Sequence, residues 1–257
     1  MNYDPLTTAG APCWPELATT DQDRAGEFYG ALWGWTTESS GPEFGGYANF
    51  SLGGRRVAGC MKTMDASQPV VWNTYLWTTD AEVTTKAAAA NGGHVIVPAM
   101  QVGPLGSMAG VIDPGGAFIG AWQPGEHRGY QVIDEPGTPG WFELHTRDYD
   151  ATVAFYRDVF GWDTHAVSDV PEFRYTTLGE GANQRAGIMD ASAFLPEGAP
   201  ASWSIYFQVP DTDTALAHIA ELGGAMVLPA EDTPYGRLAG ATDPTGALFK
   251  LLQPPAM

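Results

Sequence analysis

The segment Trp141–Trp162 reads WFELHTRDYDATVAFYRDVFGW, and it repeats an earlier segment of the same chain. The earlier copy, Trp14–Trp35, reads WPELATTDQDRAGEFYGALWGW, and the ungapped pair shares ten of twenty-two residues. A repeat offset by 127 residues in a chain of 257 predicts two similar domains. The second copy carries His145 where the first has Ala18. We therefore expect a duplicated unit whose two copies have diverged.

Bulk composition bounds the class of protein. An apolar content of 44% suits buried cores, and the nine Trp residues serve either those cores or flat apolar ligands. The formal net charge of −18 opposes binding to nucleic acid or to an anionic membrane surface. Cys13 and Cys60 have no CxxC spacing, so neither a disulfide framework nor a zinc cluster is indicated.

The N-terminal sequence MNYDPLTTAGAPCW lacks the basic start and the apolar core of a secretory signal. No apolar run approaches the length that spans a bilayer. We therefore expect a cytoplasmic protein, either a monomer or a homodimer.

Each half of the chain predicts a strand, a helix and three strands, twice over. In the first unit, residues 14–20 suit a strand, Asp21 is placed to cap a helix, and Gly34 is placed to end it. The apolar residues between them recur at helical spacing. A second unit follows from Val71 to Trp122, with Asp113-Pro114 in the turn before its last strand. The boundaries predicted from this pattern are a first domain at 1–124, a linker at 125–140 and a second domain at 141–257.

A strand, a helix that carries Phe-Tyr and ends in Gly-Trp, and a D-P-x-G turn before a final strand resemble the vicinal oxygen chelate superfamily. That superfamily includes glyoxalase I, extradiol dioxygenases and the bleomycin-resistance proteins. The resemblance covers nearly the whole chain and is closest to tandem-domain actinobacterial members labelled glyoxalase-like or hydroxylase. It implies an α+β fold of four βαβββ modules, paired into two cupped eight-stranded sheets, each a partly closed barrel with a cavity.

The resemblance also implies where a metal ion would bind, and the residues at those places are unsuited to one. Divalent metal sites need several nitrogen or oxygen ligands that converge on one point. None of the six family ligand positions holds His, Glu or Asp, and an ammonium group at one of them opposes a cation directly. We therefore expect no metal cofactor. The six positions fall on Trp14, Trp141, Asn73, Ser204, Gly120 and Lys250.

Side chains that alternate along a strand place a second set of residues on the cavity face. In the second domain this set includes Glu143, His145 and Lys250, which suit acid–base chemistry: a carboxylate orients an imidazole, and an ammonium stabilises an enolate or phenolate. Structural roles stay open as alternatives. Glu143 recurs as Glu16 in a copy without the histidine, which suits a role in packing, and Lys250 can extend to solvent. The predicted ligand-binding set is Trp14, Glu16, Asn73, Tyr75, Trp77, Trp122, Trp141, Tyr206 and Gln208.

Three functions remain open. The favoured hypothesis is a metal-independent protein whose cavity binds, and possibly transforms, a bulky aromatic small molecule, with hydroxylase-like or lyase-like chemistry in the second domain. The second is a metal-dependent glyoxalase or dioxygenase. The third is a non-catalytic interaction protein, which a cavity filled by side chains would favour. The chain has no G-x-G-x-x-G in a strand–helix context, so a nucleotide cofactor is not indicated.

Overall fold

The computed structural model describes residues 7–65 and 67–255, and it folds into two sheets with helices at their sides. Part of the segment considered above for a secretory signal, residues 1–6, lies outside the described residues. The four α-helices are α1 (Gln22–Trp33), α2 (Ala81–Ala90), α3 (Tyr149–Phe160) and α4 (Thr212–Glu221). The first half of the chain supplies strands β1 (Pro12–Thr19), β2 (Thr36–Ser39), β3 (Ala48–Leu52), β4 (Arg55–Lys62), β5 (Val71–Trp77), β6 (His94–Val102), β7 (Gly106–Ile112) and β8 (Phe118–Pro124). The second half supplies β9 (Pro139–Thr146), β10 (Thr164–Val170), β11 (Phe173–Leu178), β12 (Ala186–Asp190), β13 (Ser202–Gln208), β14 (Ala225–Thr233), β15 (Gly236–Thr242) and β16 (Leu248–Gln253).

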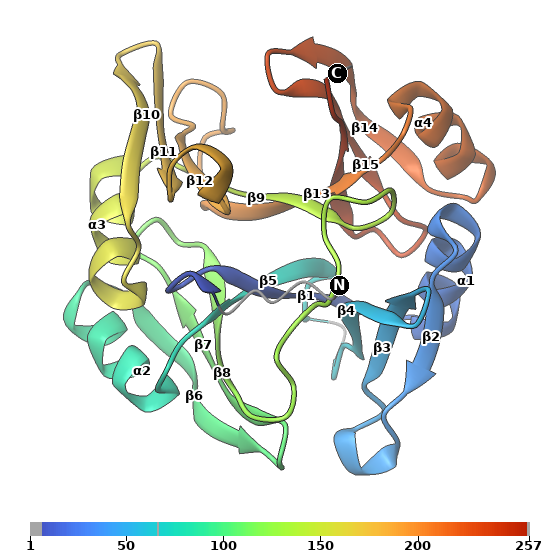
Figure 1. The fold of residues 1–257 in the computed structure, drawn as a ribbon, viewed down its shortest axis with the longest axis horizontal. Helices are drawn as coiled ribbons and strands as arrows, with labels where there is room; N and C mark the ends of the chain where they lie inside the picture. The colour runs from blue at the N-terminus through green and yellow to red at the C-terminus, as the bar shows by residue number, and fades with distance from the viewer. Residues whose placement is uncertain (1–6, 66, 256–257) are drawn as a thin grey trace.

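The two sheets have the same topology, which confirms the predicted α+β fold of four modules. Their strand orders are β2-β3-β4-β1-β5-β8-β7-β6 and β10-β11-β12-β9-β13-β16-β15-β14. Both sheets curve into a cup, and the cups open away from each other (Figure 1). Each order runs between two edge strands, so neither sheet closes, and the expected partly closed barrels are open cups. We call them the first cup and the second cup.

Capping residues mark the starts of three helices and the end of α1. The Asp21 carboxylate accepts the Arg24 N–H at the start of α1, and Gly34 ends this helix in the left-handed conformation at φ 73°. Asp80 caps α2 in the same way, and Asp211 caps α4. These caps satisfy backbone N–H groups that the first turn of a helix leaves without partners. The helix start predicted at Asp21 is therefore confirmed.

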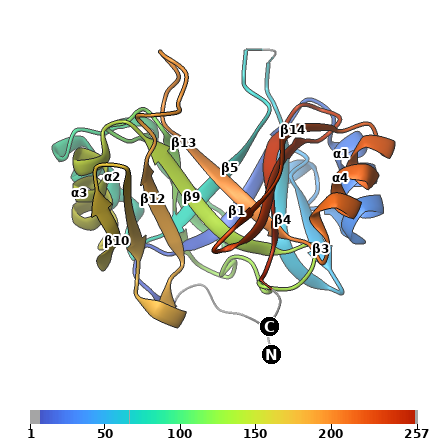
Figure 2. The same ribbon diagram turned by 90° about the horizontal axis from the view of Figure 1, so that it is seen from above.

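Helices of the two halves pair at the sides of the molecule. Figure 1 shows α1 beside α4 on one side and α2 beside α3 on the other, and Figure 2 shows the same pairing from above. Trp33 of α1 contacts Phe207 and Phe249 of the second sheet, with ring centroids 4.7 and 5.5 Å apart. The apolar cores of the two halves therefore form one continuous cluster.

Two tyrosine–aspartate hydrogen bonds join the halves symmetrically. Tyr29 of α1 donates to Asp243 at 3.0 Å, and Tyr156 of α3 donates to Asp113 at 3.0 Å. Each aspartate lies in the turn before the last strand of the opposite half. Burial raises the pKa of Asp113 to about 6, although backbone N–H groups and the Tyr156 hydroxyl oppose that shift. The two domains are thus locked together through the turns that precede β8 and β16.

The linker runs along the ends of both sheets. It occupies residues 125–138, because β8 ends at Pro124 and β9 begins at Pro139. The Tyr130 hydroxyl donates to the Pro12 carbonyl of the first half at 2.8 Å, and the Gly137 N–H donates to the Gln208 carbonyl of the second half at 2.8 Å. The linker is therefore packed against both halves. No helix in the described ranges has both the length and the apolar character needed to cross a membrane.

Candidate active site in the second cup

A cluster of ionisable side chains lies on the floor of the second cup. Glu143 and His145 alternate along β9, so both point to the same face of the sheet. The neighbouring strand β13 places Tyr206 beside Trp141, and β16 places Lys250 beside Tyr206. Strand pairing alone thus brings three central strands to one point. The structure groups Glu143, His145 and Lys250 as the face pattern predicts.

Glu143 is the centre of this cluster. Its Oε2 lies 2.7 Å from the His145 Nε2 and accepts the Tyr206 hydroxyl at 2.5 Å. Its Oε1 accepts the Tyr175 hydroxyl at 2.9 Å. The Lys250 Nζ forms an ion pair with the same Oε2 at 3.5 Å and donates to the Tyr206 hydroxyl at 2.8 Å. The carboxylate is therefore surrounded by donors, and the alternative in which Lys250 extends to solvent is wrong.

These contacts determine the charge of the cluster. Burial alone raises the pKa of Glu143, but the hydrogen bond from His145 and the charge of Lys250 lower it to about 2. Burial lowers the pKa of Lys250, and the attraction of Glu143 offsets part of that shift. Burial also raises the pKa values of Tyr175 and Tyr206, and the charge of Glu143 adds to the effect. Both tyrosines therefore stay protonated and donate to an ionised Glu143.

Counting protons assigns different tasks to the members of the cluster. Because Glu143 is ionised, the proton between it and His145 resides on the imidazole Nε2. A neutral imidazole then has its lone pair on Nδ1, for which the described residues offer no hydrogen-bond partner. His145 is partly open, with 14% of its side chain exposed, whereas Glu143 is 8% exposed. Within this pair, His145 is thus the more accessible side chain, and Glu143 is the buried partner that holds its Nε2.

The first cup contains the same arrangement without the charged partners. The Tyr75 hydroxyl donates to Glu16 at 3.0 Å, and the Trp14 indole donates to the Tyr47 hydroxyl at 2.7 Å. In the second cup Trp141 likewise donates to Tyr175, at 2.9 Å. Burial raises the pKa of Glu16, and the hydrogen bonds of the two tyrosines offset only part of the shift. The two cups thus hold equivalent carboxyl groups whose pKa values are shifted in opposite directions.

Glycines on neighbouring strands make room for these tyrosines. A methyl group at Gly187 would overlap the Tyr175 hydroxyl, and one at Gly59 would overlap the Tyr47 hydroxyl. At Gly120, the first-cup counterpart of Lys250, a methyl group would overlap the ring of Tyr75. The first cup therefore has no space for a second lysine unless Tyr75 moves.

The linker and the N-terminal segment engage several predicted ligand-binding residues. Linker residue His127 packs edge-on against Trp14 and Trp122 at 4.4 and 5.5 Å, and its carbonyl accepts the Trp122 indole N–H. Burial lowers the pKa of His127 to about 4, and nearby Arg56 adds to the effect, so His127 is neutral. Trp14, Tyr75 and Trp122 are all buried. Side chains and the linker fill this part of the first cup.

Two further predicted residues lie at strand ends. The Trp77 indole donates to the Thr8 carbonyl, and the Gln208 amide donates to Asp134 of the linker at 3.1 Å. Asn73 pairs in register with Glu16 on the first floor. Face alternation alone does not reveal that Trp77 and Gln208 are engaged by other segments.

Sequence reasoning missed the tyrosines that come from the third strand of a module, Tyr175 and its counterpart Tyr47. An insertion shifts the spacing between them, so the ungapped repeat did not align them. The pairs Tyr47–Gly59 and Tyr175–Gly187 were the available signal, because a tyrosine and a glycine recur together in both halves.

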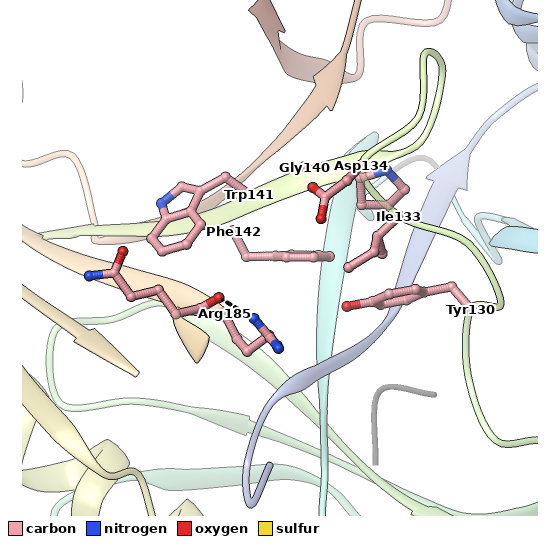
Figure 3. Close-up of a pocket in the computed structure, with 9 residues that line it drawn as sticks. Tyr130, Ile133, Asp134, Gly140, Trp141, Phe142 and Arg185 are labelled. Atoms are coloured by element: carbon pink, nitrogen blue, oxygen red, sulfur yellow. Dashed lines mark hydrogen bonds between the residues drawn. The ribbon is translucent and has the colours of Figure 1, made fainter. Parts of the chain in front are cut away.

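A small cavity lies beside Trp141, between the linker and β9 (Figure 3). Its volume is about 40 Å³, which holds little more than a water molecule. Tyr130 and Phe142 stack along one wall, with ring centroids 6.1 Å apart. This cavity is too small for an aromatic ligand.

Comparisons with known proteins agree with this architecture. A family model described as the Glyoxalase/Bleomycin resistance protein/Dioxygenase superfamily matches residues 138–251. The chain is 35% identical over 251 residues to CFP32 of Mycobacterium bovis, provisionally named a glyoxylase, and the match covers 95% of each chain. It is 34% identical over 264 residues to the anthracycline biosynthesis protein DauV of a Streptomyces species, covering 95% of this chain and 93% of DauV. The crystal structure of the Mn(II)-bound glyoxalase from Novosphingobium aromaticivorans has the same fold, with a TM-score of 0.64, 15% identity, and coverage of 96% of this chain and 82% of that one.

Matched substitutions of the two floor carboxylates test the electrostatics. We expect Glu143→Gln to lower the free energy of unfolding by about 3 kcal/mol, because it leaves Lys250 buried without its counter-charge. Glu16→Gln leaves no buried cation without a counter-charge, so we expect it to lower the free energy of unfolding by about 1 kcal/mol or less. Urea denaturation of both variants measures the difference. Equal losses would contradict the assigned charge states.

The same variants are expected to change the pH dependence of stability in opposite directions. The pKa of Glu143 is about 2 in the folded protein, below its ordinary value of 4.5, so its stabilising effect is lost as pH falls from 4.5 towards 2. The pKa of Glu16 is raised, so its contribution is present below 4.5 and is lost as pH rises through the folded value. Relative to the wild type, Glu143→Gln should therefore lose less stability in acid, and Glu16→Gln should recover stability as pH rises. Unfolding curves between pH 2 and 8 measure both trends.

Proposed function

The chain belongs to the glyoxalase/bleomycin resistance protein/dioxygenase superfamily, and on this premise we propose that its second cup binds a planar hydroxylated aromatic compound and removes a proton from it without a metal ion. The observation that carries the proposal is the hydrogen bond of 2.7 Å between Glu143 and His145. It holds the imidazole through Nε2 and leaves Nδ1 without a hydrogen-bond partner among the described residues, on a side chain that is 14% exposed. A histidine held by a carboxylate in this way is suited to general-base catalysis.

The proton transfer is simple to balance. The ligand hydroxyl gives its proton to the His145 Nδ1, and the O–H electron pair stays on the ligand oxygen as a phenolate or enolate. The product imidazolium lies against the Glu143 carboxylate, and Lys250 contacts the same carboxylate oxygen. A positive charge beside the nascent oxyanion lowers the free energy of the ionised ligand. The cluster therefore favours ligands with a weakly acidic hydroxyl group.

The ligand class rests on two further observations. Around His145 the second cup presents Trp141, half-buried, and Phe194, 56% exposed, which provide flat apolar surface. The similarity to the anthracycline biosynthesis protein DauV supports a polycyclic aromatic ligand. The first cup is filled by its own side chains, which supports a scaffolding role for the first domain. We place ligand binding in the second domain.

The donor set argues for chemistry without a metal ion. Lys250 occupies one of the family ligand positions, and its ammonium group is paired with the carboxylate that a cation would need. Trp141 occupies another, and its indole offers no lone pair for coordination. The described residues contain no group of three or more His, Cys, Asp or Glu side chains arranged to hold a metal ion. These residues do not fit the divalent site of the metal-bound relatives.

A chromophoric ligand tests binding and deprotonation together. We expect 2-hydroxyanthraquinone to quench tryptophan fluorescence and to show the absorption of its ionised form when bound, at a pH where the free compound is neutral. His145→Gln keeps an N–H donor for Glu143 but lacks a basic nitrogen, so it should bind the compound without the absorption change. His165→Gln is the matched control and should behave as the wild type, because His165 is a half-buried histidine on β10 that pairs with Asp163.

Anthraquinone without the hydroxyl group is the ligand control, and it should bind more weakly and show no ionisation. Absence of quenching by every hydroxylated compound would remove the proposal and favour the interaction-protein alternative. An absorption change that persists in His145→Gln would remove the assigned base.

Elemental analysis and treatment with a chelator test whether the protein needs a metal ion. We expect the purified protein to contain well below one equivalent of any transition metal by elemental analysis. Dialysis against EDTA should leave ligand affinity and the bound absorption spectrum unchanged, because no step depends on a cation. Loss of the spectrum after EDTA, with recovery on adding Mn²⁺ or Fe²⁺, would favour the metal-dependent alternative.

A further inference from the structure

The segment 191–201 joins β12 to β13 and crosses the end of β9, because these strands lie on either side of β9. It carries Phe194, whose ring meets the His145 imidazole edge-on with centroids 5.4 Å apart. Although it touches this ring, 56% of Phe194 is exposed. Figure 2 shows the segment as an orange projection next to β13. A large apolar ring is thus held open to solvent directly beside the candidate base.

A single arginine fixes this segment. The Arg147 guanidinium donates to the carbonyls of Leu195 and Pro196, both at 2.5 Å, and of Ala199 at 2.7 Å. Arg147 follows His145 by two residues and comes directly after the last residue of β9, so the segment is anchored close to the candidate base. A planar guanidinium with several donors suits this task, because it bonds several carbonyls in one geometry.

The first domain lacks each of these features. The repeat places Ala18 at the position of His145 and Thr20 at the position of Arg147. The equivalent segment between β4 and β5 covers only residues 63–70. The two halves therefore differ in three ways near this imidazole: in the histidine itself, in the arginine, and in the longer segment with its exposed ring. A purely structural loop would give no reason for the histidine, the arginine and the exposed ring to occur together.

We propose that Phe194 determines ligand specificity in the second cup, as a fixed aromatic wall against which the ring bearing the ionised hydroxyl packs. Arg147 is a positioning residue that holds this wall in place. The inference rests on the proposed function and deepens it: the ligand has to be flat at the hydroxyl-bearing ring, because it packs against an exposed ring that stands edge-on to the imidazole. Edge and face contacts between aromatic rings supply the preference for such a ligand.

Substitutions at Phe194 test the wall separately from the base. We expect Phe194→Ala to raise the Kd for 2-hydroxyanthraquinone about tenfold, from loss of the aromatic contact and its apolar area. The absorption of the ionised ligand at saturation should remain, because His145 is intact. Phe194→Tyr should keep the Kd within about threefold of the wild type, whereas Phe194→Leu should resemble Phe194→Ala. Met64→Ala, an exposed apolar residue in the matching first-domain segment, is the control and should leave the Kd unchanged.

Arg147→Gln tests the anchor. It should raise the Kd several-fold and speed amide hydrogen exchange in 191–201, whereas Phe194→Ala should leave exchange elsewhere in the second sheet unaltered. If the wild type binds the compound and Phe194→Ala binds it equally well, this inference alone is overturned. If the wild type binds no hydroxylated aromatic compound, the proposed function falls and this inference falls with it. Thermal melts confirm that the variants are folded.

Discussion

A carboxyl group buried on the floor of each sheet is the constraint from which both cups are built. Burying an ionised carboxylate without donors costs several kcal/mol, so its neighbours have to compensate or the group has to become neutral. Both halves supply a tyrosine from the adjacent module and another backed by a tryptophan indole. The second half adds His145 and Lys250, which keep Glu143 ionised. The first half adds neither, and the pKa of Glu16 rises. The same buried carboxyl group is thus accommodated in two ways in one chain, with charged partners in the second half and without them in the first.

The different partners of Glu16 and Glu143 make the floors of the two cups unequal, although the halves share one fold. Glycine at position 120 lets the ring of Tyr75 lie where Lys250 extends in the other cup, so the first floor has no cation beside Glu16. The linker then places a neutral His127 against Trp14 and Trp122. In the second cup, Lys250 forms an ion pair with Glu143, and the exposed ring of Phe194 stands beside His145. Among the described residues, the ion pair on the floor and the exposed ring beside it therefore occur in the second domain.

Much of the fold could be read from the sequence, because its signals are local. The aspartate caps, the glycine after α1 and the repeated order of elements each depend on a few neighbouring residues. The grouping of Glu143, His145 and Lys250 was also within reach, since strand alternation and module order decide it. Tyr175 was missed because its contact depends on the pairing of β11 with β12 and on the space above Gly187. The coverage of Trp77 and Gln208 was equally hidden, because the N-terminal segment and the linker provide it through long-range contacts. Sequence periodicity indicates the face of a sheet but not what lies over it.

The first domain still contributes to the site, through contacts that cross between the halves. Tyr29 of α1 holds Asp243, and this aspartate fixes the turn from which β16 leads to Lys250. The carbonyl of Gly115, in the corresponding turn of the first domain, accepts the Ala201 N–H at the end of the segment that carries Phe194. The lysine and the aromatic wall are therefore both positioned by groups of the opposite half.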